Sequence, residues 1–204
     1  MYDVLIIGGG VAGMSCALVL GSAHHKPFAA DKKIGILVHQ KASQLQDALF
    51  NNAYGIPPGT TGAALLRESR EHLASQYPHV EQIENEKVLR IEGQYPQFTV
   101  ITNKNSYQTR LIVVAVGAAN TFYIDGLMQY VIPHRKMNPE KNRIQLMNDD
   151  HKVVDGIYVA GTLAGWRSQL SIASGSGASV ATDILTLWNG GQHAQSHDKV
   201  QPKI

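Results

Sequence analysis

The ten residues 6–15 read Ile-Ile-Gly-Gly-Gly-Val-Ala-Gly-Met-Ser, and they decide the fold of the chain. Residues 4–7 are apolar and rich in β-branched side chains, which is typical of a buried strand. Residues 11–20 contain no proline and only one glycine, so they predict a helix that ends near Gly21. The chain is therefore expected to open with a strand, a glycine-rich turn and a helix.

The glycines of this turn follow the spacing Gly-x-Gly-x-x-Gly. Gly8 allows the tight turn, Gly10 lets the backbone approach a pyrophosphate, and Gly13 lets the helix pack closely on the strand. An anion would lie on the free N–H groups of Val11 and Ala12, where the helix dipole favours negative charge. Because a strand and a helix flank the motif, it favours dinucleotide binding over an ordinary glycine loop.

Composition argues against several classes of partner. The 204 residues include 18 Lys and Arg against 16 Asp and Glu, and a net charge of +2 gives no reason to expect nucleic acid or an acidic membrane. Residues 4–20 lack a basic leader and contain four glycines, so we interpret them as strand and helix, with no export signal or membrane span. The only cysteine, Cys16, excludes an intrachain disulfide and favours a cytoplasmic location. His24 and His25 have no Cys or carboxylate at ligand spacing, so we expect no metal site.

The second strand is predicted at residues 34–38. In a dinucleotide-binding fold, an acid about 20 residues after the glycines holds the ribose hydroxyls. Here His39 and Gln40 stand at the end of the strand. Each can hydrogen-bond a hydroxyl but lacks the paired acceptors of a carboxylate, so we expect a weaker or different hold on the ribose.

Further along, the pattern predicts helices and short strands. Thr60 or Thr61 can cap a helix that runs to about Gln76. Its apolar stripe is Leu65, Leu66, Leu73 and Ala74. Strands are predicted at residues 80–83, 88–92, 97–102 and 107–116, in which three short strands with tight turns make a β-meander that ends in the apolar run 111–116. Two more short strands are predicted at 143–147 and 157–160, with a turn at 148–151 between them. The last helix is predicted at residues 166–188, and the polar tail 191–204 is expected to be disordered.

Several motifs in order resemble the flavin-binding half of the thioredoxin reductase family. After the glycine turn, Ser43-Gln44-Leu45 resembles the family's Gly-Gln-Leu, and residues 50–55 stand where the family has Glu-Asn-Tyr-Pro-Gly. Residues 114–118, Val-Ala-Val-Gly-Ala, resemble Ala-Thr-Gly-Ala, and residues 156–162 resemble Gly-Val-Tyr-Ala-Ala-Gly-Asp. The resemblance covers roughly residues 1–119 and 142–188.

The resemblance implies an α/β fold of the Rossmann-like FAD-binding type, with a mainly parallel central sheet, helices and the β-meander. It implies FAD as cofactor, bound in extended form, with the pyrophosphate at the glycine turn and the flavin near the start of the last helix. The cofactor-binding residues implied by motif and resemblance together are Gly8, Gly10, Val11, Ala12, Gly13, His39, Gln40, Gln44, Leu45, Asn52, Gly117, Gly161, Thr162, Gln169 and Leu170.

The chain also departs from the family. Residues 120–155 stand where the family inserts a second domain that binds NADPH and carries a Cys-x-x-Cys pair, and these 204 residues contain no second glycine motif. Thr162 replaces an Asp of the family. We therefore expect a single FAD-binding domain over residues 1–190, in which 120–155 form a short connector. Its apolar side chains either close the gap left by the absent domain, which we favour, or line a substrate site.

Two functions follow from these patterns. The favoured one is a FAD-dependent oxidoreductase that resembles a minimal thioredoxin reductase and passes electrons through the flavin, without a dithiol relay. Its donor and acceptor would be external, a redox partner protein among them, and a homodimer is left open. The alternative is a non-catalytic FAD- or nucleotide-binding module, or one component of a multi-chain redox assembly.

Overall fold

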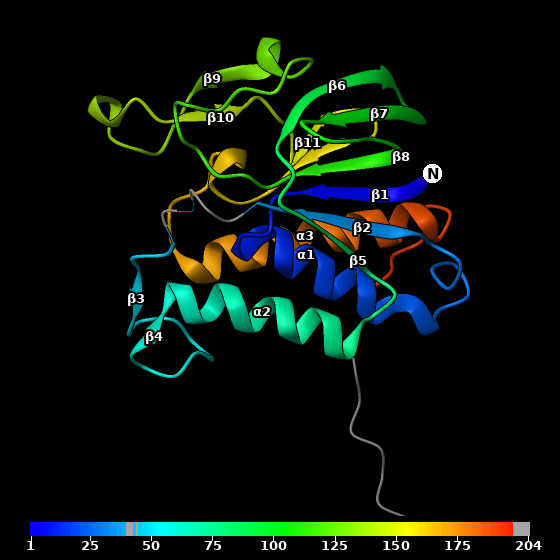
Figure 1. Cartoon of the computed structure of the whole chain (residues 1–204), viewed down its shortest axis with the longest axis horizontal. Coiled ribbons are helices and arrows are strands. Elements are labelled where there is room, and N and C mark those ends of the chain that lie inside the picture. The colour runs from blue at the N-terminus through cyan, green and yellow to red at the C-terminus, as the bar shows by residue number, and fades with distance from the viewer. Residues whose placement is uncertain (40–42, 44, 198–204) are drawn as a thin grey trace, which may run out of the picture.

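A computed structural model describes residues 1–39, 43 and 45–197. Within these residues the core is an eight-stranded sheet in the order β11-β12-β8-β1-β2-β5, to which β7 and then β6 are added along β8 (Figure 1). Its strands are β1 (Tyr2–Ile7), β2 (Ile34–Val38), β5 (Glu81–Glu84), β6 (Val88–Gln94), β7 (Gln97–Thr102), β8 (Ser106–Val114), β11 (Lys152–Val154) and β12 (Ile157–Val159). Strands β12, β8, β1, β2 and β5 are parallel, and β6, β7 and β8 form the predicted antiparallel meander. The predicted fold class is confirmed.

Three longer helices and two small sheets complete the described fold. The helices are α1 (Val11–Ser22), α2 (Gly62–Gln76) and α3 (Leu170–Trp188), with short helical turns η1 (Ala23–His25), η2 (Met128–Tyr130), η3 (Pro139–Lys141) and η4 (Gly161–Ala164). The small antiparallel sheets are β3 (Leu49–Phe50) with β4 (Thr60–Thr61), and β9 (Val131–Pro133) with β10 (Ile144–Leu146). Helices α1 and α3 lie together under the sheet, and the meander rises on its other side (Figure 1).

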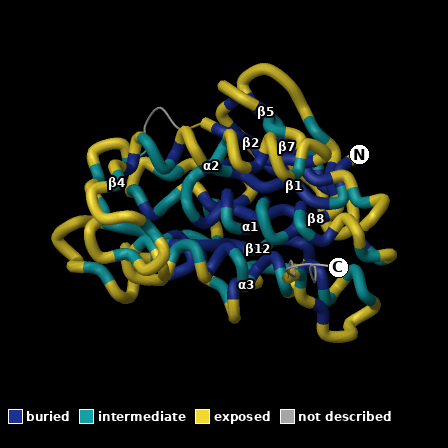
Figure 2. Tube along the Cα trace, turned by 90° about the horizontal axis from the view of Figure 1, so that it is seen from below, coloured by how far each residue is buried: buried dark blue, intermediate teal, exposed yellow. Residues whose placement is uncertain are grey.

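Strand β1 is buried on both faces, as a central parallel strand should be. Val4 and Ile6 belong to the core on the helix side, whereas Leu5 and Ile7 belong to the core under the meander. In the view from below, the buried part of the chain runs through β1, α1 and β12, and exposed loops surround it (Figure 2). The alternation fixes the register of β1, because a shift by one residue would exchange its two faces.

Helix α2 begins as predicted. The Thr61 side chain accepts a hydrogen bond from the Ala64 N–H at 3.2 Å, which satisfies one of the free donors of the first turn. Leu66 and Leu73 are buried, but Ala74 is exposed, so its place in the predicted apolar stripe is wrong.

Other boundaries also differ from prediction. Strand β5 pairs in parallel with β2 and is not part of the meander. The predicted pairing of 143–147 with 157–160 is wrong: β10 pairs with β9, and β12 pairs with β11, which lies in the predicted connector. Because 143–147 and 131–133 are both short and apolar, periodicity alone could not tell their partners.

The last helix starts later than predicted. Residues 166–169 form an irregular segment, and α3 begins at Leu170. In the tail predicted to be disordered, Ala194 is buried and its N–H donates to Thr186 Oγ1 at 3.2 Å, so this part packs on α3. Residues 198–204 of the tail lie outside the described residues.

Candidate functional site

Three glycine turns meet at one edge of the sheet. Gly8 follows β1, Gly117 lies three residues after the end of β8, and Gly161 lies two residues after the end of β12, with positive φ angles of 113°, 86° and 73°. Because these strands are neighbours and parallel, their carboxyl ends lie side by side, where α/β sheets bind ligands. The topology therefore brings together three motifs that are distant in the sequence.

The N-terminus of α1 faces this edge without a side-chain cap. Its N-cap Gly10 has φ −80° and makes no side-chain hydrogen bond, and the first turn contains no acidic residue. The bond from Met14 N–H to Gly10 C=O, at 2.8 Å, begins the helix, so the N–H groups of Val11, Ala12 and Gly13 precede the helical ladder. A Cβ on Gly10 would meet no atom within 4 Å. The open space and the free donors fit an anionic group such as a pyrophosphate.

Close packing supports the same turn. A Cβ on Gly13 would collide with the Gly8 carbonyl oxygen, and one on Gly8 would lie 2.5 Å from the Ala115 carbonyl oxygen. A Cβ on Gly161 would lie 3.0 Å from the Ala12 Cβ. The first turn of α1 and the turns after β8 and β12 are thus in contact.

The remaining predicted residues are less closely gathered. His39 is exposed directly after β2, the strand next to β1, while Gln40 and Gln44 lie outside the described residues. Leu45 is half-buried, and Asn52 is exposed in the loop between β3 and β4. At the other end of the set, Thr162 lies in η4, Gln169 is the exposed N-cap of α3, and Leu170 is its first residue. The assignment of these residues to a cofactor stays a prediction.

Two buried histidines fasten the loop between β12 and α3. His134 is buried, and its Nε2 lies 3.0 Å from the Thr162 carbonyl oxygen. His151 Nε2 lies 2.9 Å from Ser176 Oγ and accepts from the Trp166 indole N–H at 3.1 Å. No periodicity marks a single buried histidine in a turn, so sequence reasoning missed both.

The Ser176 hydroxyl completes this network. It accepts a hydrogen bond from the Gly161 N–H at 2.8 Å, and its own proton can be donated to His151 Nε2. A Ser-His-Asp hydrolase is not supported, because Ser176 is buried and Asp150, 3.7 Å from His151 Nδ1, has a side chain that is 92% exposed. The network instead fixes the Gly161 turn against α3.

Cys16 lies in α1, 0% exposed, and burial raises the pKa of its thiol well above the usual range. It is therefore packed as a small buried apolar side chain, and its thiol is kept in the protonated form. Among the described residues no group of three or more His, Cys, Asp or Glu side chains could hold a metal ion.

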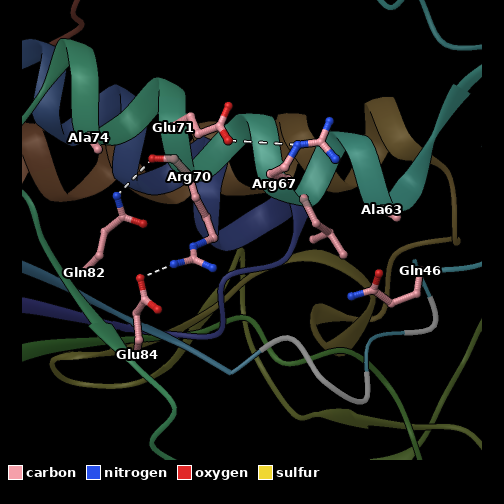
Figure 3. Close-up of a pocket in the computed structure, with 9 residues that line it drawn as sticks. Gln46, Ala63, Arg67, Arg70, Glu71, Ala74, Gln82 and Glu84 are labelled. Atoms are coloured by element: carbon pink, nitrogen blue, oxygen red, sulfur yellow. Dashed lines mark hydrogen bonds and ion pairs between the residues drawn. The ribbon is translucent and has the colours of Figure 1, made fainter.

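A separate hollow of about 440 Å³ lies between α2 and β5. Its arginines face carboxylates: Arg70 pairs with Glu84, and Arg67 Nε lies 4.0 Å from Glu71 (Figure 3). Gln82 donates to the Arg70 carbonyl oxygen at 3.0 Å and so ties β5 to the helix. The Arg70–Glu84 pair and the Gln82 bond join the helix to the edge of the sheet, whereas Arg67 and Glu71 pair within α2. None of these residues is part of the glycine edge.

The parallel sheet and the glycine turns at its carboxyl edge define a dinucleotide-binding α/β protein. Residues 2–154 match the family described as pyridine nucleotide-disulphide oxidoreductase, and the chain belongs to that family. Proteins of this family and the thioredoxin reductases with this fold are flavoproteins that bind FAD, which confirms the predicted cofactor at the level of the family. No helix among the described residues is long and apolar enough to cross a membrane.

Two curated relatives match part of this chain and a smaller part of their own length. A thioredoxin reductase from Mycolicibacterium smegmatis is 29% identical over 124 residues, 58% of this chain and 36% of that protein. A ferredoxin–NADP reductase from Levilactobacillus brevis is 31% identical over 116 residues, 57% of this chain and 34% of that protein. The chain thus spans about a third of the length of the curated relatives it matches.

Solved structures agree on the fold. A thioredoxin reductase from Gloeobacter violaceus superposes with a TM-score of 0.72 at 15% identity, over 98% of this chain and 99% of that one. A ferredoxin-flavin thioredoxin reductase from Clostridium acetobutylicum gives a TM-score of 0.65 at 16% identity, over 92% and 98% of the two chains.

Proposed function

We propose that this chain is a FAD-dependent oxidoreductase that passes electrons through the flavin itself, from an external donor to an external acceptor, without a dithiol relay of its own. The observation that carries the proposal is Cys16, the only cysteine of the chain, which is fully buried. A dithiol relay needs one thiolate that attacks the substrate and a second thiol that resolves the mixed disulfide. One inaccessible thiol can do neither.

The residues of the glycine edge have distinct tasks in this proposal. The N–H groups of Val11 and Ala12 would bind the pyrophosphate in the space left by Gly10, and His39 would contact the ribose. Bound FAD supplies hydride or single-electron chemistry. The uncapped start of α3 at Gln169 and Leu170 would stabilise negative charge on the flavin by its dipole.

A second candidate is a FAD-binding component of a multi-chain redox assembly. His39 stands in place of the ribose-binding acid and Thr162 in place of the family's Asp, which weakens two contacts expected to hold the cofactor. The chain also spans only about a third of its curated relatives' length. A homodimer and a cytoplasmic location remain predictions.

The choice of acceptor tests the proposal. We would reduce the flavin of the purified protein photochemically without oxygen, then offer a disulfide protein, a small quinone or ferricyanide. Rapid reoxidation by the quinone and ferricyanide, and none by the disulfide protein, is expected. The Cys16→Ala variant, with one atom fewer in a buried site, should give the same rates.

Other results would contradict it. If the parent protein reduces the disulfide protein and Cys16→Ala does not, the thiol is catalytic and another chain supplies the resolving cysteine. If a flavin-loaded sample exchanges electrons with none of the acceptors, the non-catalytic binding component is the correct reading.

A further inference from the structure

We infer that the loop between β9 and β10, with the segment that leads into α3, is the docking surface for an acidic electron-carrier protein. We call this surface the basic rim and define it as Arg135, Lys136, Lys141 and Arg167. The inference rests on the proposed function, because it names the kind of protein that would exchange electrons with the flavin.

The charge of the basic rim is not compensated within the described part of the chain. Several other exposed cations form ion pairs, for example Lys33 with Glu81, Arg90 with Glu92 and Lys152 with Asp155. The four rim side chains are exposed and face no carboxylate within ion-pair distance among the described residues. Residues 131–142 contain three Lys and Arg, all of them rim residues, and a single acid, Glu140. An acidic partner would supply the missing countercharge.

The two segments of the basic rim are joined to each other. Arg167 Nη1 donates to the Lys136 carbonyl oxygen at 3.1 Å, and Lys136 Nζ lies 4.1 Å above the Trp166 ring. On the other side, the Arg135 N–H donates to Gln145 Oε1 at 2.9 Å. The cations are therefore presented on a framework that is fixed before a partner arrives, which lowers the entropy cost of binding.

Apolar surface accompanies the charge. Trp166 is 39% exposed and Met147 is 53% exposed. Asn148, next to Met147, donates to the Ala164 carbonyl oxygen at 3.2 Å, which keeps Met147 near the Trp166 loop. A large aromatic side chain among cations is typical of protein docking sites, in which a few apolar anchors give affinity and charges steer the encounter.

The basic rim borders the proposed flavin site. His134, immediately before Arg135, contacts Thr162, and Arg167 stands two residues before the N-cap of α3, Gln169. β9 and β10 lie above the end of the sheet towards which β1 runs (Figure 1). A carrier bound there would lie beside the flavin. Two oxidised one-electron carriers would reoxidise one FADH2, and its two protons would pass to water.

A protein fits better than a small anion. The four cations are exposed on two surface segments, and no cradle of backbone N–H groups like that of Val11 and Ala12 lies among them. Binding of the pyrophosphate of a free dinucleotide by the basic rim is the alternative that the test also examines.

The test measures binding and needs no redox step. The full chain is titrated with an acidic [2Fe–2S] ferredoxin and with an acidic flavodoxin by calorimetry, at low and high ionic strength. The variant is Arg135→Glu/Lys141→Glu, and its matched control is Lys26→Glu/Lys87→Glu. Lys26 follows η1 beyond the far end of α1, and Lys87 precedes β6, whose start lies beside the end of β7, so both lie at the amino edge of the sheet.

We expect at least one carrier to bind, with affinity that falls as salt rises and falls about tenfold or more in the rim variant but not in the control. Reoxidation of the reduced flavin by a small uncharged quinone should stay unchanged in both variants. The inference would be overturned if neither carrier binds. It would also be overturned if a carrier binds with an affinity that changes neither with salt nor in the rim variant. A third contrary result is that inorganic pyrophosphate binds the parent protein and the control but not the rim variant, while neither carrier binds. A chain that binds a carrier but no FAD would refute the proposed function and leave the docking surface in place.

Discussion

At the scale of single residues, two glycines of the same turn are needed for different reasons, one for its backbone conformation and the other for the space that it leaves open. Gly8 has φ 113°, a backbone conformation that side chains disfavour, so it serves the turn itself. Gly10 has φ −80°, which any residue adopts, and nothing lies where its Cβ would be. Glycine at position 10 is therefore not needed for the backbone conformation, but it keeps the space in front of α1 open.

Glu86 offers a test of stability at the same scale. It is buried and accepts hydrogen bonds from Thr102 Oγ1 at 2.6 Å, Asn105 Nδ2 at 2.7 Å and Tyr107 OH at 2.8 Å. Burial by itself raises the pKa of Glu86, but these bonds and Lys104 outweigh it, and the net pKa is lowered.

Because the folded-state pKa lies below the unfolded value of about 4.3, the contribution of Glu86 is present above that pH. It is lost as the pH falls through the lower, folded-state pKa. We expect Glu86→Gln to reduce the free energy of unfolding by about 1–3 kcal/mol at neutral pH. The difference from the parent should shrink in acid, whereas the exposed control Glu68→Gln should change little. Urea unfolding across pH measures both, and a constant difference down to the most acid pH would contradict the assignment.

At the scale of elements, α1 and α3 are held together by small residues. A Cβ on Gly177 would collide with the Ala12 carbonyl oxygen, whereas one on Gly175, two residues earlier in α3, would meet nothing within 4 Å. Substitution of the two glycines by alanine therefore distinguishes the effect of helix packing on stability from the effect of helix propensity.

We expect Gly177→Ala to lower the free energy of unfolding by about 1–3 kcal/mol through forced separation of the helices. The matched Gly175→Ala should raise it by up to about 1 kcal/mol, since Ala favours a helix over Gly. Thermal or urea unfolding of the two variants gives the comparison. Equal effects of the two substitutions would mean that the α1–α3 contact adjusts without cost.

Local patterns explain which elements could be predicted. The strand 34–38, the cap at Thr61 and the meander each carry their own signal, and each is found. The pairing of β10 with β9 is accompanied by a bond across their loop, from the Arg135 N–H to Gln145 Oε1, and the segment before α3 is held by the contact of Arg167 with the Lys136 carbonyl oxygen. Neither contact leaves a pattern in the sequence. The glycine edge was predictable because its motifs mark strand ends, whereas His134 and His151 gain their roles only from burial in the folded chain.

At the scale of the whole molecule, the two ends of the sheet differ in kind. The carboxyl edge carries the glycine turns, the uncapped starts of α1 and α3 and, beside them, the basic rim. Near the amino edge, Lys32 and Arg110 both pair with Asp3. The carboxyl edge therefore combines free N–H donors with a cluster of four cations that are unpaired among the described residues, where a flavin and its partner would meet.

The central claim is that the glycine turn holds FAD, and the flavin content of purified Gly10→Val tests it most directly. Valine can adopt the backbone of Gly10 and fills only the open space in front of α1, so the fold should survive while the pyrophosphate is excluded. We expect the parent protein and the surface control Ala74→Val to carry flavin absorbance, and Gly10→Val to lose most of it with an unchanged unfolding transition. Flavin content equal to that of the parent in a folded Gly10→Val protein would contradict the placement of the cofactor at this turn.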